Sequence, residues 1–323
     1  MGIQYWDNLH RKSWFDKLKF MNTELHLSPE IADTLKIGGA VVALESTLIT
    51  HGLPYPANVE TALAMEAAVR SQGAVPATIA VLKGRLSVGL TADDIERLGR
   101  MPSANVRKCS RRDLPIAVGL GEDGATTVAG TMIVANIAGI HLFATGGIGG
   151  VHRGHPFDIS ADLIELGRTP VAVVCSGAKS ILDLPLTMEV LETQGVPVIG
   201  YGTDMLPAFY SRSSGLPVGV YLETPRDVAQ VIQATWSLNL GHGLLITVPV
   251  PEGDELPDSV AEIAIQQATA EANAQGIHGK DVTPFVLGRV AELTEGQSRR
   301  ANTSLLVNNA RVAALIALEL ARS

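Results

Sequence analysis

The segment of residues 143–183 holds most of the side chains in this sequence that could act in catalysis. It reads FATGGIGGVHRGHPFDISADLIELGRTPVAVVCSGAKSILD. Two apolar runs, residues 140–145 and 171–175, lead into its polar loops of Gly, His, Asp, Ser and Lys. Catalytic groups are common in such loops, because a rigid sheet positions the backbone N–H groups and charges that follow its strands.

Lys179 follows the second apolar run, in the sequence CSGAKS. A lysine in a dry pocket at a strand end can lose its proton, and the neutral amine is a nucleophile toward a sugar aldehyde or its ring carbon. Lysine is seldom placed beside an apolar strand without a role, which favours a catalytic function. The alternative is a lysine that binds phosphate or forms a salt bridge.

Asp158 and Asp162 lie one helical turn apart in the sequence DISAD, at the start of a predicted helix over residues 158–167. This spacing places both carboxylates on one face, where two oxygen donors suit a magnesium or manganese ion that keeps several waters. Helix capping by Asp158 is the structural alternative. The nearby His152 and His155 could bind metal or phosphate, although an isolated histidine is more often structural.

Glu45 ends the apolar run of residues 40–44 and is followed by Ser46 and Thr47. A carboxyl group at the end of a buried strand can have a raised pKa and can serve as a general acid or base. A hydrogen-bonded structural glutamate is equally consistent with this position.

A basic cluster, KCSRRD, contains Lys108, Arg111 and Arg112. In a chain of net charge −8, such a cluster forms either a phosphate pocket or a charged oligomer interface. We favour phosphate binding for Lys108.

The glycine-rich sequence GGIGG at residues 146–150 fits neither common nucleotide template. The dinucleotide fingerprint read from Gly147 and Gly149 needs a glycine where His152 stands, and no register gives the Gly-Lys-Ser/Thr of a P-loop. These glycines either let the backbone approach a ligand or serve only the conformation of the loop.

Strand and helix patterns alternate along most of the chain, which indicates an α/β protein with a largely parallel or mixed sheet. Predicted strands cover residues 40–44, 75–82, 105–110, 140–145, 171–175, 196–200 and 244–250. Predicted helices cover residues 28–36, 57–72, 158–167, 184–193, 259–274 and 283 to the end, with another after Thr91 and an Ala- and Gly-rich one within residues 116–139. We expect a three-layer α/β/α catalytic domain over residues 28–323, with a helical C-terminal part, after an N-terminal extension over residues 1–27.

The composition argues against several classes of protein. With 46% hydrophobic and 18% charged residues, the 323-residue chain is globular. Its negative charge and 4% aromatic content disfavour nucleic-acid binding, and no apolar run approaches the ~20 residues that span a bilayer. Cys109 and Cys175 lie in apolar runs without zinc or disulfide spacing, which predicts buried free thiols in a cytoplasmic protein.

Several long motifs resemble the pseudouridine-5′-phosphate glycosidases, also called the indigoidine synthase A-like family. The motifs are ALEST, GAVPATIAV, KCSRRDLP, FATGGIGGVHRG, FDISADL, VVCSGAKSILD, GVPVIGY and a C-terminal NNA. The similarity extends from about residue 28 to the end of the sequence. The link between HRG and FDIS is shorter than in some members, which leaves the roles of His152 and His155 open.

The resemblance implies reversible cleavage of the C–C glycosidic bond of pseudouridine 5′-phosphate to uracil and ribose 5-phosphate. Lys179 would be the nucleophile, Glu45 the proton donor, and Asp158 the ligand of one Mn²⁺ or other divalent cation per subunit. The implied substrate-binding residues are Lys108, Val128, Ser160, Ala161 and Asp162. A homotrimer without nucleic-acid or membrane partners is also implied.

A C-glycosidic bond has no leaving oxygen to protonate, so the usual carboxylate pair of glycosidases is insufficient. A lysine imine at C1′ would provide an electron sink, while an acid protonates the departing uracil carbon. The main alternative is a Schiff-base aldolase acting on a sugar phosphate, which would require no metal and release no uracil. A non-catalytic sugar-phosphate-binding protein is a third interpretation.

Overall fold

A computed structural model of the chain describes residues 25–277, 279 and 282–322. The predicted extension over residues 1–27 therefore lies largely outside the described residues. Its last part, Leu25–Leu27, forms strand β1, which pairs in parallel with β4 (Arg85–Val88). The first described residues of the chain thus already belong to the central sheet.

The central sheet contains 11 strands within the described residues. Its main path runs β1-β4-β3-β2-β7-β10-β14-β12-β13, and β6 pairs with both β3 and β5. The bounds are Val75–Leu82 for β3, Val41–Leu44 for β2, Leu142–Ala144 for β7, Ala172–Cys175 for β10, Leu244–Thr247 for β14, Val198–Tyr201 for β12, Val220–Leu222 for β13, Arg107–Cys109 for β5 and Gly124–Thr126 for β6. Only the pairs β3–β4 and β3–β6 are antiparallel here, so the predicted largely parallel or mixed sheet is confirmed.

The middle strands are apolar along their whole length. The sequences VVAL of β2, LFA of β7, AVVC of β10 and LLIT of β14 are buried at every position. Such continuous runs are typical of parallel strands that are covered on both faces, because neither face of the strand meets water. The hydrophobic core therefore lies on both sides of these strands.

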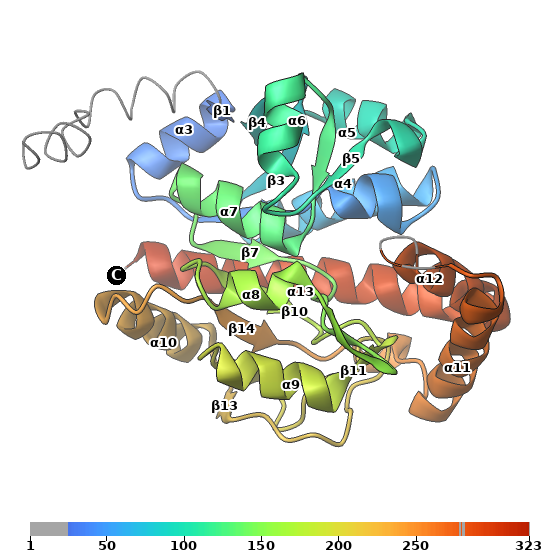
Figure 1. The fold of residues 1–323 in the computed structure, drawn as a ribbon. Helices are drawn as coiled ribbons and strands as arrows, with labels where there is room; N and C mark the ends of the chain where they lie inside the picture. The colour runs from blue at the N-terminus through green and yellow to red at the C-terminus, as the bar shows by residue number, and fades with distance from the viewer. Residues whose placement is uncertain (1–24, 278, 280–281, 323) are drawn as a thin grey trace, which may run out of the picture.

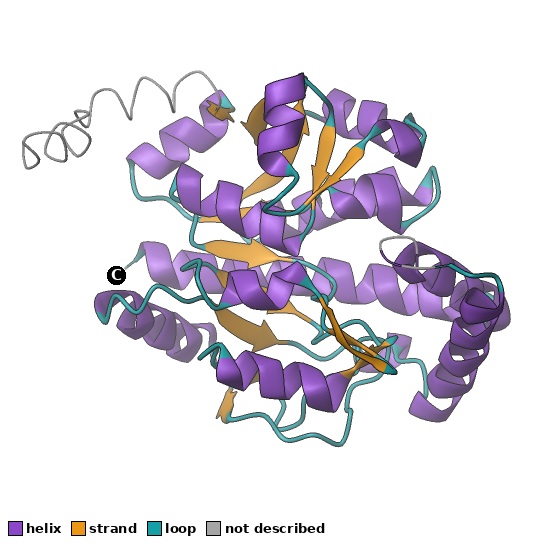
Figure 2. Ribbon diagram, in the orientation of Figure 1, coloured by secondary structure: helices purple, strands orange, loops and turns teal. Residues whose placement is uncertain are grey.

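Helices cover both faces of the sheet, as Figures 1 and 2 show. On one face, α13 (Gln297–Ala321) packs against β2, β7 and β10 and against its neighbours α4 (Ala57–Ser71) and α10 (Pro225–Ser237). On the other face lie α7 (Val128–Ala138), α8 (Ala161–Leu166) and α9 (Leu184–Thr193). The remaining helices are α3 (Pro29–Lys36), α5 (Ala92–Arg100), α6 (Leu114–Leu120), α11 (Asp258–Ala274) and α12 (Val282–Leu293). The predicted three-layer arrangement with a helical C-terminal part is confirmed.

Among the described residues, α13 is the one helix that is long and apolar enough to cross a membrane by length and composition. Half of its most apolar 18-residue window is buried within the fold. Figure 1 shows α13, in red, running across the middle of the molecule behind the central strands. Its apolar side chains thus serve the core of the domain.

The Ala- and Gly-rich helix predicted within residues 116–139 is α7, and two shorter elements, α6 and β6, precede it. Gly121 ends α6 with a positive φ of 67°, and the residues Gly124–Thr126 then pair with β3 and β5 as strand β6. The start of another predicted helix was wrong. The helix predicted over residues 158–167 starts later, as α8 at Ala161. The preceding residues form a small antiparallel sheet of β8 (Val151–His152), β9 (His155–Ile159) and β11 (Leu182–Asp183).

Candidate active site

Glu45 lies at the end of β2, and the backbone that follows it is held by one threonine of β6. The Ser46 hydroxyl accepts a hydrogen bond from the Thr126 N–H at 2.9 Å. The Thr47 hydroxyl donates to the Thr126 carbonyl at 2.8 Å. Because these bonds fix the chain directly after Glu45, the backbone that carries the carboxyl group has little freedom.

The Glu45 carboxyl accepts a hydrogen bond from the Thr145 hydroxyl, at the end of the neighbouring strand β7. Burial raises the pKa of the Glu45 carboxyl, and this effect outweighs the opposing influence of the Lys179 charge and the Thr145 hydrogen bond. The charge of Asp162 also raises this pKa, whereas the charge of Lys108 lowers it. A raised pKa suits a carboxyl group that has to carry a proton near neutral pH.

Lys179 lies in the loop between β10 and β11, which is bound to the glycine-rich loop after β7. The Lys179 N–H donates to the Ile148 carbonyl at 3.1 Å, and the Ile148 N–H donates to the Gly177 carbonyl at 3.1 Å. Ile148 is fully buried and Lys179 is partly buried. The two loops therefore support each other and hold the Lys179 amine within electrostatic range of the Glu45 carboxyl.

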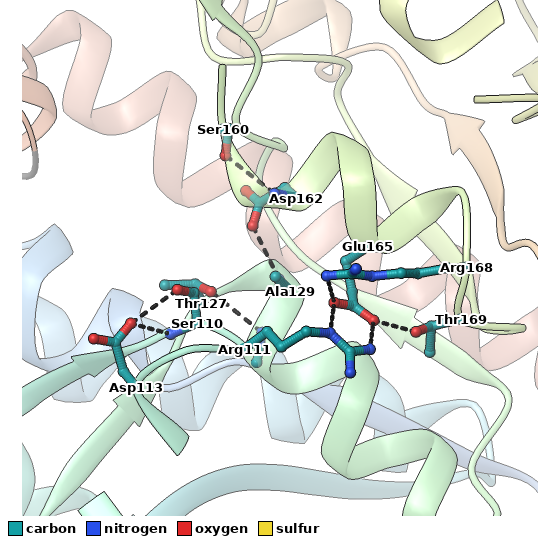
Figure 3. Close-up of polar contacts among 11 residues, drawn as sticks. Ser110, Arg111, Asp113, Thr127, Ala129, Ser160, Asp162, Glu165, Arg168 and Thr169 are labelled. Carbon is teal, nitrogen blue, oxygen red and sulfur yellow. Dashed lines mark hydrogen bonds and ion pairs between the residues drawn. The ribbon is translucent and has the colours of Figure 1, made fainter. Parts of the chain in front are cut away.

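Asp162 is a buried carboxylate that accepts backbone hydrogen bonds from two other segments. Its Oδ1 accepts from the Ala129 N–H, in the first turn of α7, at 2.9 Å. Its Oδ2 accepts from the Gly149 N–H at 2.9 Å. Figure 3 shows the side chain pointing from the start of α8 toward Ala129. Asp162 therefore joins α7, α8 and the glycine-rich loop, with both oxygens occupied.

The glycines of this loop are required for space. A Cβ atom on Gly149 would lie 2.1 Å from Ser160 Oγ and 2.8 Å from Asp162 Oδ2, and one on Gly147 would lie 2.7 Å from the Phe209 ring. Neither glycine has a positive φ. The close approach of Ser160 and Asp162 to the backbone at Gly149 thus explains why a side chain is excluded there.

The three side chains of the basic cluster, which begins on β5 and continues in the loop after it, have different roles. Lys108 is partly buried on β5, and its charge acts on Glu45. The Arg111 guanidinium instead binds the buried Glu165 carboxylate of α8 through two hydrogen bonds of 2.8 and 2.5 Å. Arg112 is 89% exposed. Figure 3 shows Arg111 spanning the space between its loop and α8. Of the three side chains, Lys108 is thus the one that belongs with the candidate catalytic groups.

Asp158 lies in β9, whose residues are all exposed. The predicted position at a helix N-terminus was wrong, because Ser160 is the residue that caps α8, where its hydroxyl accepts from the Asp162 N–H at 3.3 Å. Asp158 and Asp162 therefore do not share a helix face. The pair of carboxylate ligands that the sequence spacing indicated is absent from this part of the structure.

The strands β8 and β9 border a cavity of about 360 Å³. Its walls include His152, His155, Asp158 and Ile181, with residues of α11 and α12 opposite. Arg153 fixes one side, because its guanidinium donates to the Ser180 carbonyl at 3.0 Å, close to the nucleophile candidate. The cavity thus places Asp158 beside the loop that carries Lys179.

The described residues contain no cluster of three or more His, Cys, Asp and Glu side chains that could hold a metal ion. A single exposed carboxylate fits a strongly hydrated cation, because such an ion binds one or two carboxylates and keeps several waters. Asp158 meets this condition. The donor set does not fit a cation enclosed by protein ligands alone.

The structure therefore gathers part of the predicted site and extends it. Lys108, Asp162 and Lys179 each lie within electrostatic range of Glu45. Val128 and Ser160 adjoin this group, as the first residue of α7 and the cap of α8, while Ala161 is exposed. Thr145 and Asn309 were missed by sequence reasoning, although a polar NNA motif inside an apolar helix was a usable signal.

Comparison with known proteins identifies the family. Residues 30–319 match the sequence profile of the family described as indigoidine synthase A like protein. The chain belongs to the indigoidine synthase A-like family. The pseudouridine-5′-phosphate glycosidase of Hahella chejuensis is 56% identical over 92% of this chain and 98% of its own. That of Escherichia coli is 54% identical over 95% of this chain and 98% of its own.

Solved structures of related proteins have the same fold. The prealnumycin C-glycosynthase AlnA, in complex with ribulose 5-phosphate, is 43% identical, with a TM-score of 0.85 over 93% of this chain and 97% of the other. An indigoidine synthase A-like protein of Thermotoga maritima is 34% identical, with a TM-score of 0.84 over the same shares. The family and the fold class predicted from the sequence are both confirmed.

Proposed function

We propose that this protein reversibly cleaves the C–C glycosidic bond of pseudouridine 5′-phosphate to uracil and ribose 5-phosphate. Relatives that are 56% and 54% identical are pseudouridine-5′-phosphate glycosidases, in agreement with the predicted enzyme class. The observation that supports the catalytic residues is the proximity of Glu45 and Lys179, in which a carboxyl of raised pKa lies within electrostatic range of an amine. Both groups follow strands of one parallel region of the sheet.

Lys179 acts as the nucleophile in this proposal. Its Nζ, in the neutral form, attacks C1′ of the ribose, and the C1′–O4′ bond breaks with its electron pair going to O4′. A proton then passes from the attacking nitrogen to O4′, which leaves an opened ring and a C1′–N bond whose nitrogen has a free lone pair. The hydrogen bond from the Lys179 backbone N–H to the Ile148 carbonyl holds the loop in place. The side-chain amine therefore needs little reorganisation to reach the sugar.

Glu45 acts as the general acid. It donates its proton to C5 of the uracil ring, the nitrogen lone pair forms the C1′=N imine, and the C1′–C5 electron pair returns to the ring as neutral uracil leaves. Water then hydrolyses the imine, which releases ribose 5-phosphate and restores the Lys179 amine. Burial keeps the pKa of Glu45 raised, so the proton is present when the base departs.

The substrate contacts come from the ends of α7 and α8 and from β5. The Ala129 and Gly130 N–H groups of α7 already bind Asp162 and Thr127, so we assign the Val128 N–H, at the first helical position, to an anionic oxygen of the substrate. Lys108 supplies positive charge for the phosphate.

The residues that begin α8 complete the substrate contacts. The Ser160 hydroxyl accepts from the Asp162 N–H and can donate its own proton to the substrate. Ala161 follows Ser160 at the surface. Asp162 contributes by holding the first turn of α7 and the glycine-rich loop in place through the Ala129 and Gly149 N–H groups.

One Mn²⁺ or other divalent cation per subunit belongs to the proposal. Asp158 would hold it, with waters as the other ligands, and the ion would supply positive charge toward sugar and phosphate oxygens. Manganese binding measured by isothermal titration calorimetry should weaken by at least about tenfold in Asp158→Asn, whereas Asp258→Asn, an exposed aspartate at the start of α11, should bind as wild type. Equal affinities of all three proteins would remove Asp158 from the metal site.

We also propose that the protein is a cytoplasmic homotrimer, as the family resemblance implies. Multi-angle light scattering of the full chain measures the assembly directly, and a mass of one or two chains would contradict a trimer. Fractionation of cells, followed by detection of the protein, tests the compartment.

The decisive experiment combines product release with chemical trapping. Purified protein with Mn²⁺ and pseudouridine 5′-phosphate should release uracil, and borohydride should reduce the imine to a stable ribose 5-phosphate adduct on Lys179. The Lys179→Ala variant should release no uracil and form no adduct. Wild-type protein that forms an adduct with sugar phosphates but releases no uracil would favour the aldolase alternative.

A further inference from the structure

Asn309 is a wholly buried amide on α13 that binds the ends of two catalytic strands. Its Nδ2 donates to the Thr145 carbonyl, directly after β7, at 2.9 Å, and lies 3.1 Å from the Ser176 hydroxyl, directly after β10. Asn309 and Ser176 are both 0% exposed. A buried amide requires such partners, because an unpaired polar group in the core is costly. The helix on the far side of the sheet is thus bonded to the strand ends that carry the site.

Thr145 transmits this contact to Glu45. Its carbonyl binds Asn309, its N–H donates to the Val174 carbonyl at 3.0 Å, and its hydroxyl donates to Glu45 Oε1. Thr145 is 1% exposed, so its own polar groups are shielded from water. The position of the hydroxyl is therefore fixed by the backbone that Asn309 and Val174 hold.

The groups that act on Glu45 come from several different elements. The Lys179 amine reaches it from the loop after β10, the Asp162 carboxylate from α8 and the Lys108 amine from β5. The Thr145 hydroxyl binds the carboxyl directly. A hydroxyl can donate to the ionised carboxylate and can rotate to accept from the protonated form. It therefore orients Glu45 before and after proton transfer.

We propose that Asn309 and Thr145 form a positioning pair for the general acid, in which Asn309 anchors the Thr145 backbone and the Thr145 hydroxyl orients Glu45 and helps to set its protonation. This inference rests on the proposed function, because it assigns the proton donor role to Glu45. It predicts that the Thr145 hydroxyl matters for catalysis although it does not touch the reacting atoms.

The test compares Thr145→Val, which keeps the shape but removes the hydroxyl, with Thr145→Ser, which restores it. The kcat of Thr145→Val should fall by about 10–100-fold with a much smaller change in KM, because the acid is mispositioned. Loss of a donor to the carboxylate raises the pKa of Glu45, so the alkaline limb of kcat/KM should move to higher pH. Thr145→Ser should recover most of both properties.

Thr247→Val is the matched control. Thr247 is also wholly buried at the end of a central strand, and its hydroxyl donates to the Ile199 carbonyl at 3.0 Å rather than to Glu45. It should lose stability without moving the pH profile. A wild-type pH profile and kcat in folded Thr145→Val, or an equal shift in Thr247→Val, would overturn the proposal.

A titration without turnover separates this inference from the proposed function. The Glu45 carboxyl can be followed by ¹³C NMR in protein with labelled glutamate, and the Glu45→Gln variant identifies its signal. Its midpoint should lie at higher pH in Thr145→Val than in wild type, whether or not uracil is released. Equal midpoints would refute the role of the hydroxyl, whereas absence of uracil from wild type would refute only the proposed reaction.

The Asn309 part of the proposal has its own measurement. Asn309→Ala should lower kcat in the same direction as Thr145→Val, and the double variant should lose little more than Thr145→Val alone, because both residues act through one contact. Fully multiplicative losses in the double variant would show that Asn309 acts independently of Thr145. Thermal unfolding confirms that each variant is folded at the assay temperature.

Discussion

The Arg111 guanidinium donates two hydrogen bonds to the Glu165 carboxylate and so joins the loop after β5 to helix α8. Burial alone would raise the pKa of Glu165, but the bonds from Arg111 and Thr169 and the charge of Arg168 outweigh it, and the pKa lies below its usual range. Figure 3 shows these side chains around the carboxylate. The loop that follows Lys108 and β5 and the helix whose first turn holds Asp162 are thus held together by an ion pair outside the site.

Glu165→Gln should lower the free energy of unfolding at pH 7 by about 2 kcal/mol, because hydrogen bonds to a charged and buried acceptor are lost. The depressed pKa means that this stabilisation is present above about pH 4.3 and is lost as the pH falls through the lower folded value. The difference between the two proteins in urea denaturation should therefore shrink in acid.

Glu30→Gln provides the control for Glu165. Glu30 also binds an arginine through two hydrogen bonds, from Arg70 at 2.6 and 2.7 Å, but its side chain is 50% exposed. Such surface pairs contribute about 0–1 kcal/mol. An equal loss in Glu30→Gln and Glu165→Gln would contradict a special role for the buried carboxylate.

Glu45→Gln should reduce kcat by about 10²–10⁴-fold, which is the range for loss of a general acid. The pH dependence of its effect on stability should also be opposite to that of Glu165→Gln. The folded pKa of Glu45 is raised, so its contribution to stability is greatest below the unfolded pKa and is lost as the pH rises through the folded value. Glutamine mimics the neutral form of the carboxyl group. The melting temperature of Glu45→Gln should therefore be higher than that of the wild type at alkaline pH. A lower melting temperature of the variant at every pH would argue against the raised pKa.

Asp162→Asn and Asp158→Asn should differ in stability although the two residues are neighbours in sequence. Asp162 is 6% exposed and accepts from the Ala129 and Gly149 N–H groups, so the amide should cost about 2 kcal/mol in urea denaturation. Asp158 is exposed in β9, and its replacement should change stability by less than about 0.5 kcal/mol. If both variants lost the same stability, the structural role of Asp162 would be disproved.

Gly149→Ala should destabilise the protein by about 1–3 kcal/mol, the usual cost of overpacking, because the new Cβ meets Ser160 Oγ at 2.1 Å. It should also lower kcat, since Ser160 and Asp162 would have to move. Gly119→Ala, in α6 with no atom within 4 Å of the new Cβ, is the matched control and should be neutral or slightly stabilising. Thermal unfolding and uracil release together check both expectations, and a stable, fully active Gly149→Ala would contradict the packing that we describe.

Much of the fold followed from local sequence patterns. The runs AVVAL and LLITVPV, which became β2 and β14, are apolar and β-branched, and Thr91 and Ser28 are helix caps that the structure confirms. The two cysteines are buried free thiols, as predicted. These features depend on neighbouring residues alone, so the sequence is sufficient to reveal them.

The errors occurred where long-range contacts decide the local structure. The sequence DISAD has helical spacing throughout, but pairing of β9 with β8 holds Asp158 in a strand, and the helix starts after Ser160. The single residues Thr145 and Asn309 are far apart in the chain, and nothing in either local sequence indicates that they are bonded. Sequence reasoning therefore found groups that could do chemistry more readily than the groups that position them.

The contacts of Asn309 have a consequence for the order in which this protein matures. The strands that end at Thr145 and Ser176 are synthesised long before α13, the last helix of the described chain. Domains generally fold as units during synthesis, and here the amide that joins the two strand ends follows Thr145 by 164 residues and Ser176 by 133 residues. The strand ends that carry the site can therefore be joined in this way only after α13 has emerged from the ribosome.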